Sequence, residues 1–386
     1  MDMSGDEAGA VLLVANYESD VGYAWWLMEA FWATISAEAS SAGRRCILAY
    51  PQVNAVPKVI RDAPINITTW RVRPSGLKSA LDSARRMRRE RVKSVYLTDW
   101  PVYSLSYFIW RLFGVQRIVL HDHSGAERPP ITGPKAWLRS AIHAAGLFSC
   151  DTYVAVSDYI GRRFVENSRI PSRRCLVVRN GIVPFSGEAD RRLSIRSELS
   201  IPHDAVVVVL VSRASFTKGW DFAIRCAAEL KGLSNRATSA HFVFVGDGPD
   251  LGAFRGLAKQ GGVDDVCHFL GHRSDVLQIL GAADLAFHPS KAEALSLATL
   301  EFMCAELPVI VPDRPSVCAL TEDHVDGRIY ESTSVVSASA IIDELIGDQQ
   351  ARCRMGRAAR AKVLSDYTLE KTLDRFRLHV VPRLLG

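Results

Sequence analysis

Short apolar runs alternate along the chain with longer segments in which apolar residues recur every three or four positions. Runs of this kind are typical of strands buried on both faces of a parallel sheet. In the first half of the chain they cover residues 11–15, 46–49, 95–98, 117–120 and 152–156. In the second half they cover residues 206–211, 241–245, 266–270, 285–288 and 308–311. The alternation predicts an α/β protein with a parallel sheet in each half and helices on both faces of each sheet.

The longer segments predict helices, of which those over residues 24–42 and 77–90 are the clearest in the first half. A further helix is expected over residues 367–380, with an apolar face made by Leu369, Leu373, Phe376 and Val380. Loops at the carboxyl ends of parallel strands commonly hold the ligand. The pattern therefore places a binding cleft at the strand ends of the two sheets.

A chain of 386 residues is longer than one hydrophobic core normally organises, so two domains are expected. The periodicity breaks within residues 180–202, where Pro184, Gly187 and charged residues occur. We therefore predict a first α/β domain over residues 1–180, a second over residues 181–365, and a C-terminal helical segment over residues 366–386 that packs on the first domain.

Composition narrows the class of protein. An apolar fraction of 48% supplies two cores and excludes a disordered chain. The eight cysteines show no C-x-x-C pair, which is typical of reduced thiols in a cytosolic protein. The first ten residues are acidic, unlike a secretory signal, and no apolar run is long enough to span a bilayer. These features favour a cytoplasmic location.

The net charge of +5 is unevenly distributed. Residues 1–180 carry 24 basic and 16 acidic side chains, a balance of +8, whereas the remainder carries 23 and 26, a balance of −3. The basic residues gather at 85–93 and at Arg162, Arg163, Arg173 and Arg174. An anionic bilayer at the cytoplasmic face or a polyprenyl-phosphate acceptor fits such a surface, and a solvated helix face is the alternative. No recognised nucleic-acid module accompanies the charge, so no nucleic-acid partner is expected.

Two glutamates flank the start of a predicted helix directly after the apolar run 282–287. The free N–H groups and the dipole of a helix N-terminus favour a phosphate. Glu293 lies at this turn and Glu301 about one turn into the helix, where a carboxylate can accept hydrogen bonds from two sugar hydroxyls. The spacing fits a nucleotide sugar, although two glutamates on a solvated helix face would look the same.

Arg213 and Lys218 lie in the loop after the first strand of the second half. Transfer from a nucleotide sugar leaves a diphosphate, whose charge an enzyme stabilises with a metal or with fixed cations. The sequence has no Asp-x-Asp triplet of the kind that holds a divalent ion. These two cations therefore point to a metal-independent site, and two ordinary surface cations are the alternative.

Glycine and histidine residues mark further strand ends. Gly246 and Gly248 follow the run 241–245, where they would let the backbone pass close to a donor. They do not form a dinucleotide fingerprint, because the third glycine is missing. His121 and His123 follow the run 117–120 as a polar pair at the end of a strand. Two histidines offer too few ligands for a metal.

These elements, taken in order, resemble glycosyltransferase family 4. The pair Glu293 and Glu301 matches the Glu-x7-Glu signature of that family. Further matching segments are residues 157–160, 179–182, 211–219, 244–249, 269–271 and 307–310. The resemblance implies a GT-B fold, in which two Rossmann-like domains face each other across a cleft and the last helix returns to the first domain.

The resemblance also implies residue roles. Arg213 and Lys218 would hold the donor diphosphate, Glu293 the donor sugar and Glu301 the ribose. His123, or in second place His121, would lie by the donor sugar and the acceptor hydroxyl. The remaining donor contacts would come from Gly22, Gly246, Gly248, Ala294, Leu295, Ser296 and Leu297, of which Ser296 and Leu297 offer backbone N–H groups.

Three positions depart from the family pattern. The usual pair of glycines after the first strand is reduced to Gly22, followed by a tyrosine. Ala294 stands where a glycine commonly follows the first glutamate of the signature, and Glu306 stands where a glycine usually precedes Leu-Pro. The consequence of each depends on whether the backbone there requires φ > 0.

The resemblance implies a retaining, metal-independent transferase with no cofactor, using a nucleotide sugar as co-substrate and a glycan or a lipid-linked molecule as acceptor. Bacterial-type polysaccharide, lipopolysaccharide or glycolipid synthesis is the expected setting. Two alternatives remain from other classes: a GT-B epimerase or phosphorylase, and a non-catalytic GT-B scaffold that docks partners through its basic half. The phosphorylase is disfavoured because no pyridoxal-phosphate lysine motif is recognisable, and the scaffold because both cations and both glutamates are present.

Overall fold

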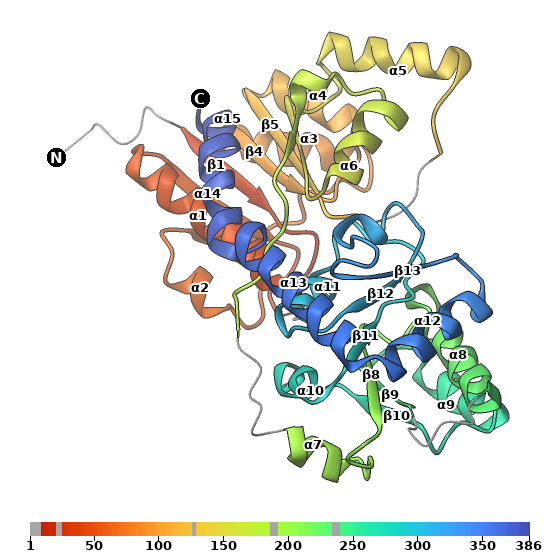
Figure 1. Cartoon of the computed structure of the whole chain (residues 1–386). Coiled ribbons are helices and arrows are strands. Elements are labelled where there is room, and N and C mark those ends of the chain that lie inside the picture. The colour runs from red at the N-terminus through yellow and green to blue at the C-terminus, as the bar shows by residue number, and fades with distance from the viewer. Residues whose placement is uncertain (1–8, 21–24, 126–128, 186–191, 234–239) are drawn as a thin grey trace. The chain divides into compact units, whose positions relative to one another are not determined.

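The computed structural model describes residues 9–20, 25–125, 129–185, 192–233 and 240–386. The chain divides into two compact units. Unit 1 comprises residues 1–179 and 370–386, and unit 2 comprises residues 180–369. Figure 1 shows both units with their elements labelled.

Unit 1 is built on a parallel sheet of seven strands in the order β3-β2-β1-β4-β5-β6-β7. Its strands are β1 (Ala10–Val14), β2 (Arg45–Tyr50), β3 (Asn66–Thr69), β4 (Val92–Thr98), β5 (Arg117–Asp122), β6 (Thr152–Ala155) and β7 (Cys175–Val177). The central β1 pairs with β2 on one side and with β4 on the other, so that Val14 lies opposite Ala49 and Leu97. All five residues of β1 are buried, as its uninterrupted apolar run predicts.

Helices cover both faces of this sheet. They are α1 (Trp25–Ser41), α2 (Lys58–Arg61), α3 (Leu77–Arg89), α4 (Leu105–Leu112), α5 (Gly133–Ala145) and α6 (Asp158–Arg162), which runs into a short π-helical turn at Arg163–Asn167. Right-handed crossovers place α1 on one face and, after the strand order reverses at β1, place α3, α4 and α5 on the other (Figure 1).

The end of the chain belongs to unit 1. Helices α14 (Leu369–His379) and α15 (Val381–Leu385) lie on the same face as α1. The Phe376 ring packs 4.6 Å from that of Phe31, and Ser94 Oγ donates a hydrogen bond to Leu384 O at 2.7 Å. Phe376 and Val380 are fully buried, which confirms the expected apolar face of a helix that returns to the first domain.

Unit 2 contains a second parallel sheet, of six strands in the order β10-β9-β8-β11-β12-β13. Its strands are β8 (Val206–Val211), β9 (Ala240–Val245), β10 (Cys267–Gly271), β11 (Leu285–Phe287), β12 (Val309–Pro312) and β13 (Gly327–Tyr330). Its helices are α7 (Arg192–Glu198), α8 (Trp220–Leu233), α9 (Leu251–Gln260), α10 (Val276–Ala282), α11 (Leu297–Cys304), α12 (Val335–Gly347) and α13 (Gln349–Asp366). Trp220 at the start of α8 packs its ring 5.1 Å from Phe244 and 5.5 Å from Phe254 at the centre of the core.

The expected fold class, two Rossmann-like α/β units with a returning C-terminal helix, is confirmed. Three strands were not predicted from the sequence: β3 and β7 at the edges of the first sheet and β13 at an edge of the second. Within the described residues, no helix is both long enough and apolar enough to cross a bilayer.

Candidate active site

The loop after β8 carries both predicted cations of unit 2. It closes with a 3-10 turn over Phe216–Lys218, and Gly219 ends that turn with φ of 75°. A Cβ atom on Gly219 would lie 2.1 Å from the carbonyl oxygen of Pro289, in the segment after β11. A second link is the hydrogen bond from Lys291 N to Thr217 O at 2.9 Å. Glycine is therefore required where the two loops meet.

This contact brings Lys218 to the first glutamate of the signature, 75 residues further along the chain. Lys218 Nζ donates to Glu293 Oε1 at 2.7 Å, and His288 Nε2 lies 3.0 Å from the same oxygen. Burial alone would raise the pKa of Glu293, but the hydrogen bonds and charges of His288 and Lys218 lower that pKa to about 2. Glu293 is therefore ionised at physiological pH. His288 is a site residue that the sequence analysis missed.

Arg213 occupies the same loop as Lys218 and is exposed. It forms no ion pair with any of the residues that the structure describes. Next to it, Ser212 Oγ accepts a hydrogen bond from the buried indole Nε1 of Trp220 at 2.8 Å, which anchors the start of the loop. The loop thus offers one cation held by a carboxylate and one that is available to an anionic ligand.

Gly246 and Gly248 pack against the backbone of this loop. A Cβ atom on Gly246, whose φ is 137°, would lie 1.9 Å from Ser212 O, and one on Gly248 would lie 2.4 Å from Ala214 O. The contact that requires glycine at both positions is therefore with the backbone of the cation loop. Their predicted contact with the donor stays a prediction.

Helix α11 begins where the sequence places an anion site. Ser296 is its N-cap, and its side chain accepts a hydrogen bond from Thr299 N at 3.1 Å. Among the described residues, the N–H groups of Leu297 and Ala298 have no acceptor. The free donors and the helix dipole suit a phosphate. Leu295 is half-buried in the turn that leads into the helix.

Glu301 lies in the second turn of α11. Its carboxylate has no hydrogen-bond or ion-pair partner in the part of the chain that the structure describes. Burial raises the pKa of Glu301 to about 7. Glu301 is half-buried, and its carboxylate lacks the hydrogen bonds that would offset this partial desolvation. Two vicinal hydroxyls of a ligand could supply them.

The pKa of Glu301 predicts how ligand binding depends on pH. We expect the affinity for a nucleotide sugar to fall by up to about tenfold per pH unit below pH 7, because the protonated carboxyl accepts fewer hydrogen bonds. In the free protein the sign is opposite: the stability that Glu301 contributes is present below its ordinary pKa and is lost as the pH rises through about 7.

Titration calorimetry at several pH values measures this effect. A nucleotide sugar is the suitable ligand, because its diphosphate carries no group that titrates in this range. The Glu301→Gln variant should bind more weakly at pH 8 and lose the pH dependence. An unchanged profile in that variant would contradict the assignment of Glu301 to a ligand hydroxyl.

In unit 1, the two predicted histidines at the end of β5 differ in burial. His121 is fully buried, with Nδ1 2.5 Å from the Tyr96 hydroxyl and its ring stacked 6.0 Å from Phe376. Burial, and to a lesser degree the neighbouring His123, lowers the pKa of His121 well below its ordinary value. His121 therefore packs in the core beneath the returning C-terminal helix.

His123 is the better candidate for contact with a ligand. It is only half-buried, and its backbone N donates to Asp99 Oδ1 at 2.6 Å. Burial lowers the pKa of His123 to about 4, although the charge of Asp122 opposes the shift. The ring is therefore neutral at physiological pH, and its Nε2 is a buried atom without a partner among the described residues.

A buried ion pair supports this strand end. Arg163 Nη2 lies 2.8 Å from Asp122 Oδ2, and the two side chains are 1% and 2% exposed. Asp122 Oδ1 also accepts hydrogen bonds from the Ser124 backbone N at 2.8 Å and the Ser124 hydroxyl at 2.5 Å. Burial, and then the charge of Asp122, raises the pKa of Asp99 to about 7. The sequence analysis missed these partners of His123.

Gly22 lies outside the described residues. Within the described ranges, no group of three or more His, Cys, Asp or Glu side chains is arranged to hold a metal ion.

Known families match most of the chain in two parts. Residues 29–184 match the model of "Glycosyltransferase Family 4", and residues 191–362 match that of "Glycosyl transferases group 1". The chain belongs to glycosyltransferase family 4. The first match lies mainly in unit 1, and the second lies in unit 2.

Among curated relatives of this family 4 chain, alpha-D-kanosaminyltransferase of Streptomyces kanamyceticus is 27% identical over 188 residues, which cover 48% of this chain and 47% of that protein. The D-inositol 3-phosphate glycosyltransferase of Corynebacterium aurimucosum is 30% identical over 172 residues, 42% of this chain and 40% of that protein. The chain thus spans about half the length of the relatives it matches.

Solved structures resemble the family 4 chain over almost its whole length. A glycosyltransferase from Rickettsia africae aligns with a TM-score of 0.77 at 15% identity, covering 98% of this chain and 99% of that one. HepE of Anabaena in complex with UDP-glucose aligns with a TM-score of 0.73 at 17% identity, covering 97% and 100%. These likenesses show the GT-B fold.

The structure explains two departures from the family 4 pattern. Ala294 is buried and does not have a positive φ, so this position does not require glycine. Glu306, directly after the C-cap of α11, has φ of 60°. Glycine is favoured at such a left-handed helix end. In this chain a glutamate accepts the conformation, and its carboxylate lies 3.7 Å from Arg360 Nε.

Proposed function

We propose that the protein transfers a glycosyl group from a nucleotide sugar to a hydroxyl acceptor, with retention of anomeric configuration and without a metal ion. The observation that carries the proposal is the cluster of Lys218, Glu293 and His288 in unit 2. In that cluster a fixed cation and an ionised carboxylate share one site at the turn that leads into α11. Membership of family 4 supports the same reaction class.

The proposed donor site uses three elements of unit 2. The diphosphate binds to Arg213, Lys218 and the free N–H groups at the start of α11. The ribose hydroxyls donate to Glu301, whose carboxylate lacks a partner among the described residues. Glu293 accepts from hydroxyls of the transferred sugar while His288 and Lys218 keep it ionised.

In the proposed reaction the acceptor oxygen forms a bond to the anomeric carbon on the face from which the diphosphate leaves. The bond between that carbon and the diphosphate oxygen breaks, and the departing oxygen takes the proton of the acceptor hydroxyl. Lys218 and Arg213 stabilise the negative charge that grows on the diphosphate. The reaction balances without a further reactant.

His123 of unit 1 is proposed to position a hydroxyl rather than to remove a proton. Its low pKa makes the imidazole a poor store for a proton during turnover, whereas its free Nε2 can make one hydrogen bond. The role is therefore one of orientation.

We further propose a glycan or lipid-linked acceptor and a place in polysaccharide, lipopolysaccharide or glycolipid synthesis. A relative from Rhizobium meliloti, 23% identical over 181 residues, is named as a lipopolysaccharide core biosynthesis glycosyltransferase, LpsE. That match covers 47% of this chain and 51% of the relative. A lipid-linked acceptor would bring the enzyme to the cytoplasmic face of a membrane.

Metal removal tests one part of the proposal. Treatment with EDTA should leave the rate of transfer nearly unchanged, because lysine and arginine side chains provide the positive charge at the diphosphate. The rate is measured as release of nucleoside diphosphate before and after dialysis against the chelator. Complete loss of activity, restored by Mn²⁺ or Mg²⁺, would contradict metal independence.

The reaction itself is tested with a panel of nucleotide sugars and simple glycoside acceptors. We expect release of nucleoside diphosphate from one donor class and a product whose anomeric configuration, read from proton coupling constants, matches that of the donor. A product of inverted configuration would overturn the retaining mechanism. Conversion of the donor to an isomeric nucleotide sugar without an acceptor would favour the epimerase.

A further inference from the structure

Helix α5 of unit 1 carries apolar side chains on its outer surface. Trp137 is 83% exposed and Leu138 is 63% exposed, and Leu147 just beyond the helix is 47% exposed. His143 is the one fully buried residue of the helix. Lys135, one turn from these apolar residues, is exposed as well. Large apolar side chains gathered in this way mark a surface that meets another molecule or a membrane.

The neighbouring helix α4 continues this surface. Leu105 is 56% exposed and Leu112 is 67% exposed, and the half-buried Phe108 lies between them on the same helical face. The Phe108 ring stacks 5.1 Å from Phe148, which follows α5. This stack joins the exposed apolar side chains of α4 to the segment that follows α5, and these side chains are here termed the apolar strip.

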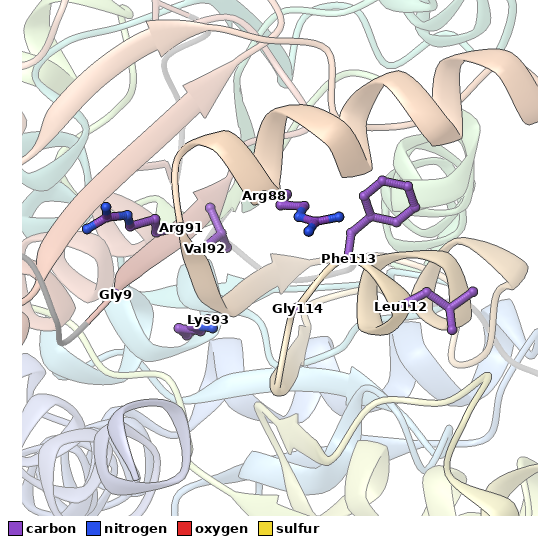
Figure 2. A pocket seen from close by; sticks show the side chains of 8 residues that line it. All are labelled: Gly9, Arg88, Arg91, Val92, Lys93, Leu112, Phe113 and Gly114. Atoms are coloured by element: carbon purple, nitrogen blue, oxygen red, sulfur yellow. The ribbon is translucent and has the colours of Figure 1, made fainter.

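Positive charge borders this strip on α3. Arg88 and Arg89 are exposed on the last turn of that helix. A pocket of about 460 Å³ lies between α3 and the end of α4, and its lining includes Arg88, Lys93, Leu112 and Phe113 (Figure 2). Figure 2 shows the side chains of Arg88 and Phe113 next to each other. The pocket thus combines guanidinium and ammonium groups with apolar side chains.

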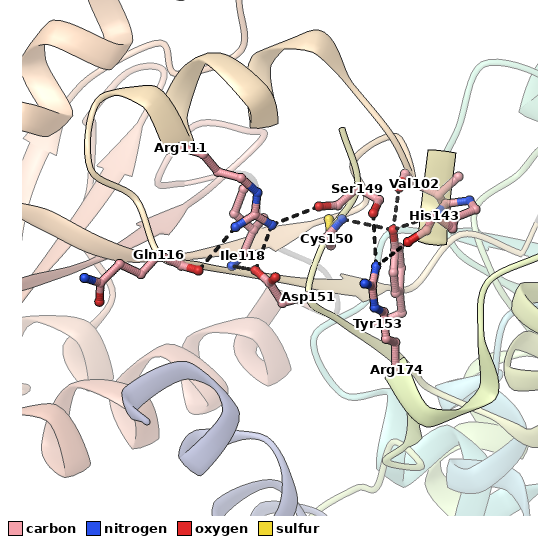
Figure 3. Close-up of polar contacts among 10 residues, drawn as sticks. All are labelled: Val102, Arg111, Gln116, Ile118, His143, Ser149, Cys150, Asp151, Tyr153 and Arg174. Carbon is pink, nitrogen blue, oxygen red and sulfur yellow. Dashed lines mark hydrogen bonds and ion pairs between the residues drawn. The ribbon is translucent and has the colours of Figure 1, made fainter. Parts of the chain in front are cut away.

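Some other arginines of unit 1 form contacts inside the unit. This corrects part of the basic cluster expected from the sequence. Arg163 is buried against Asp122. Arg174 Nη1 donates to the backbone oxygen of His143 at 2.7 Å, and Arg111 Nη2 lies 2.9 Å from Asp151 Oδ2 (Figure 3). These cations hold loops together, whereas Arg162 and Arg173 of the expected cluster are exposed, as are Arg88 and Arg89 on α3.

We propose that the outward surface of α3, α4 and α5, here termed the α3–α5 face, docks the protein on an anionic lipid bilayer. Trp137 and Leu138 enter the interfacial region, Leu105 and Leu112 continue the contact, and the pocket beside Arg88 receives a lipid headgroup phosphate. The inference rests on the proposed function only in that a lipid-linked acceptor brings the enzyme to a membrane.

The chemistry of the face favours a bilayer over a protein partner. A tryptophan with a neighbouring leucine, bordered by arginine and lysine, matches the layered polarity of a membrane surface, where aromatic rings lie at headgroup depth and cations meet phosphates. Anionic lipids also suit the +8 balance of residues 1–180. No spanning helix is needed, because apolar insertion and charge act together.

The test is co-sedimentation of the full chain with vesicles of phosphatidylcholine alone and with added phosphatidylglycerol, at low and high salt and without donor. We expect binding to the anionic vesicles that weakens as salt rises. The Arg88→Glu/Arg89→Glu variant should bind at least tenfold more weakly. The Trp137→Ala/Leu138→Ala variant should bind several-fold more weakly, with most of its remaining binding sensitive to salt.

The matched control is Arg354→Glu/Arg357→Glu, which makes the same change of charge at two exposed positions of α13 in unit 2. We expect it to bind like the unaltered chain. Equal loss in the control would show a general effect of net charge and overturn the assignment. Equal binding to both vesicle types would also overturn it, as would self-association that Trp137→Ala/Leu138→Ala abolishes in a protein that does not bind vesicles.

Thermal stabilisation by nucleotides, measured on the same variants, separates this inference from the proposed function. Nucleotide stabilisation without vesicle binding would reject the α3–α5 face as the docking surface and leave the proposed transferase untouched. Vesicle binding in a protein that no nucleotide stabilises would reject the transferase and keep the docking surface.

Discussion

Replacement of Lys218 by alanine is expected to lower kcat by about 10²–10³-fold while the protein stays folded. Lys218 is the cation that the structure fixes in place, since its Nζ lies 2.7 Å from Glu293 Oε1. Charge on the departing diphosphate grows in the transition state, so the lost interaction is stronger there than in the bound donor. The effect corresponds to about 2.7–4 kcal/mol of transition-state stabilisation.

Steady-state kinetics together with circular dichroism measure this prediction. Lys291→Ala is the matched control, because Lys291 lies two residues from Glu293 and has an exposed side chain. The control should keep kcat within about twofold, since exposed lysines contribute little to either state. A Lys218→Ala enzyme with unchanged kcat would remove Lys218 from the reaction. A Lys218→Ala protein that has lost its fold would instead assign Lys218 a structural role through Glu293.

Replacement of Arg163 by alanine is expected to lower the free energy of unfolding of unit 1 by about 3–5 kcal/mol at pH 7. Arg163 is the buried partner of Asp122, and neither side chain has meaningful access to solvent. Without the guanidinium, the Asp122 carboxylate stays buried without its counter-charge and beside Asp99.

Urea unfolding at pH 7 measures this effect. The adjacent Arg162 is exposed, so Arg162→Ala should change the free energy of unfolding by no more than about 0.5 kcal/mol. Equal stability of the two variants would show that the Asp122 pair contributes nothing to the fold.

The core of the fold could be predicted from the sequence because central strands are buried on both faces. The runs that form β1 and β8 are apolar throughout, and periodicity alone identifies them. The edge strands could not be recognised in this way. β3 has the sequence Asn-Ile-Thr-Thr and β13 begins with a glycine, so neither forms an uninterrupted apolar run.

Gly327 at the start of β13 shows why such a strand is hidden from pattern analysis. A Cβ atom there would lie 2.3 Å from the carbonyl oxygen of Val309 on β12. The requirement for glycine comes from a neighbour 18 residues away in the sequence. Glycine has a low strand propensity, so the sequence argues against a strand at this position.

The candidate site, too, could be predicted only in part. Glu293, Ser296 and Glu301 lie within nine residues of one another, so a single motif predicts the turn, the cap and the carboxylates. The partners that set their charge come from elsewhere in the chain. Lys218 was predicted as a cation but not as the partner of Glu293, and His288 was missed because only the fold shows its contact with Glu293 Oε1.

The strand end of unit 1 shows the same limit. His121 and His123 are two residues apart and could not be distinguished by spacing, whereas exposure separates them: His121 is fully buried against Tyr96 and Phe376, and His123 is half-buried. The ion pair of Asp122 with Arg163 joins residues 41 positions apart. Only the fold brings such charges together.

The central claim is that unit 2 binds a nucleotide sugar through Lys218 and Glu301, and thermal unfolding with a panel of nucleoside diphosphates and nucleotide sugars tests it most directly. At a ligand concentration about 100-fold above Kd, the account predicts a stabilisation of about 2.7 kcal/mol for the preferred base, seen as a rise in Tm. The rise should be much smaller in Lys218→Ala and in Glu301→Gln, and unchanged in Lys291→Ala. If no nucleotide raises the Tm of the unaltered protein, or if the rise is the same in all four proteins, the proposed donor site is wrong.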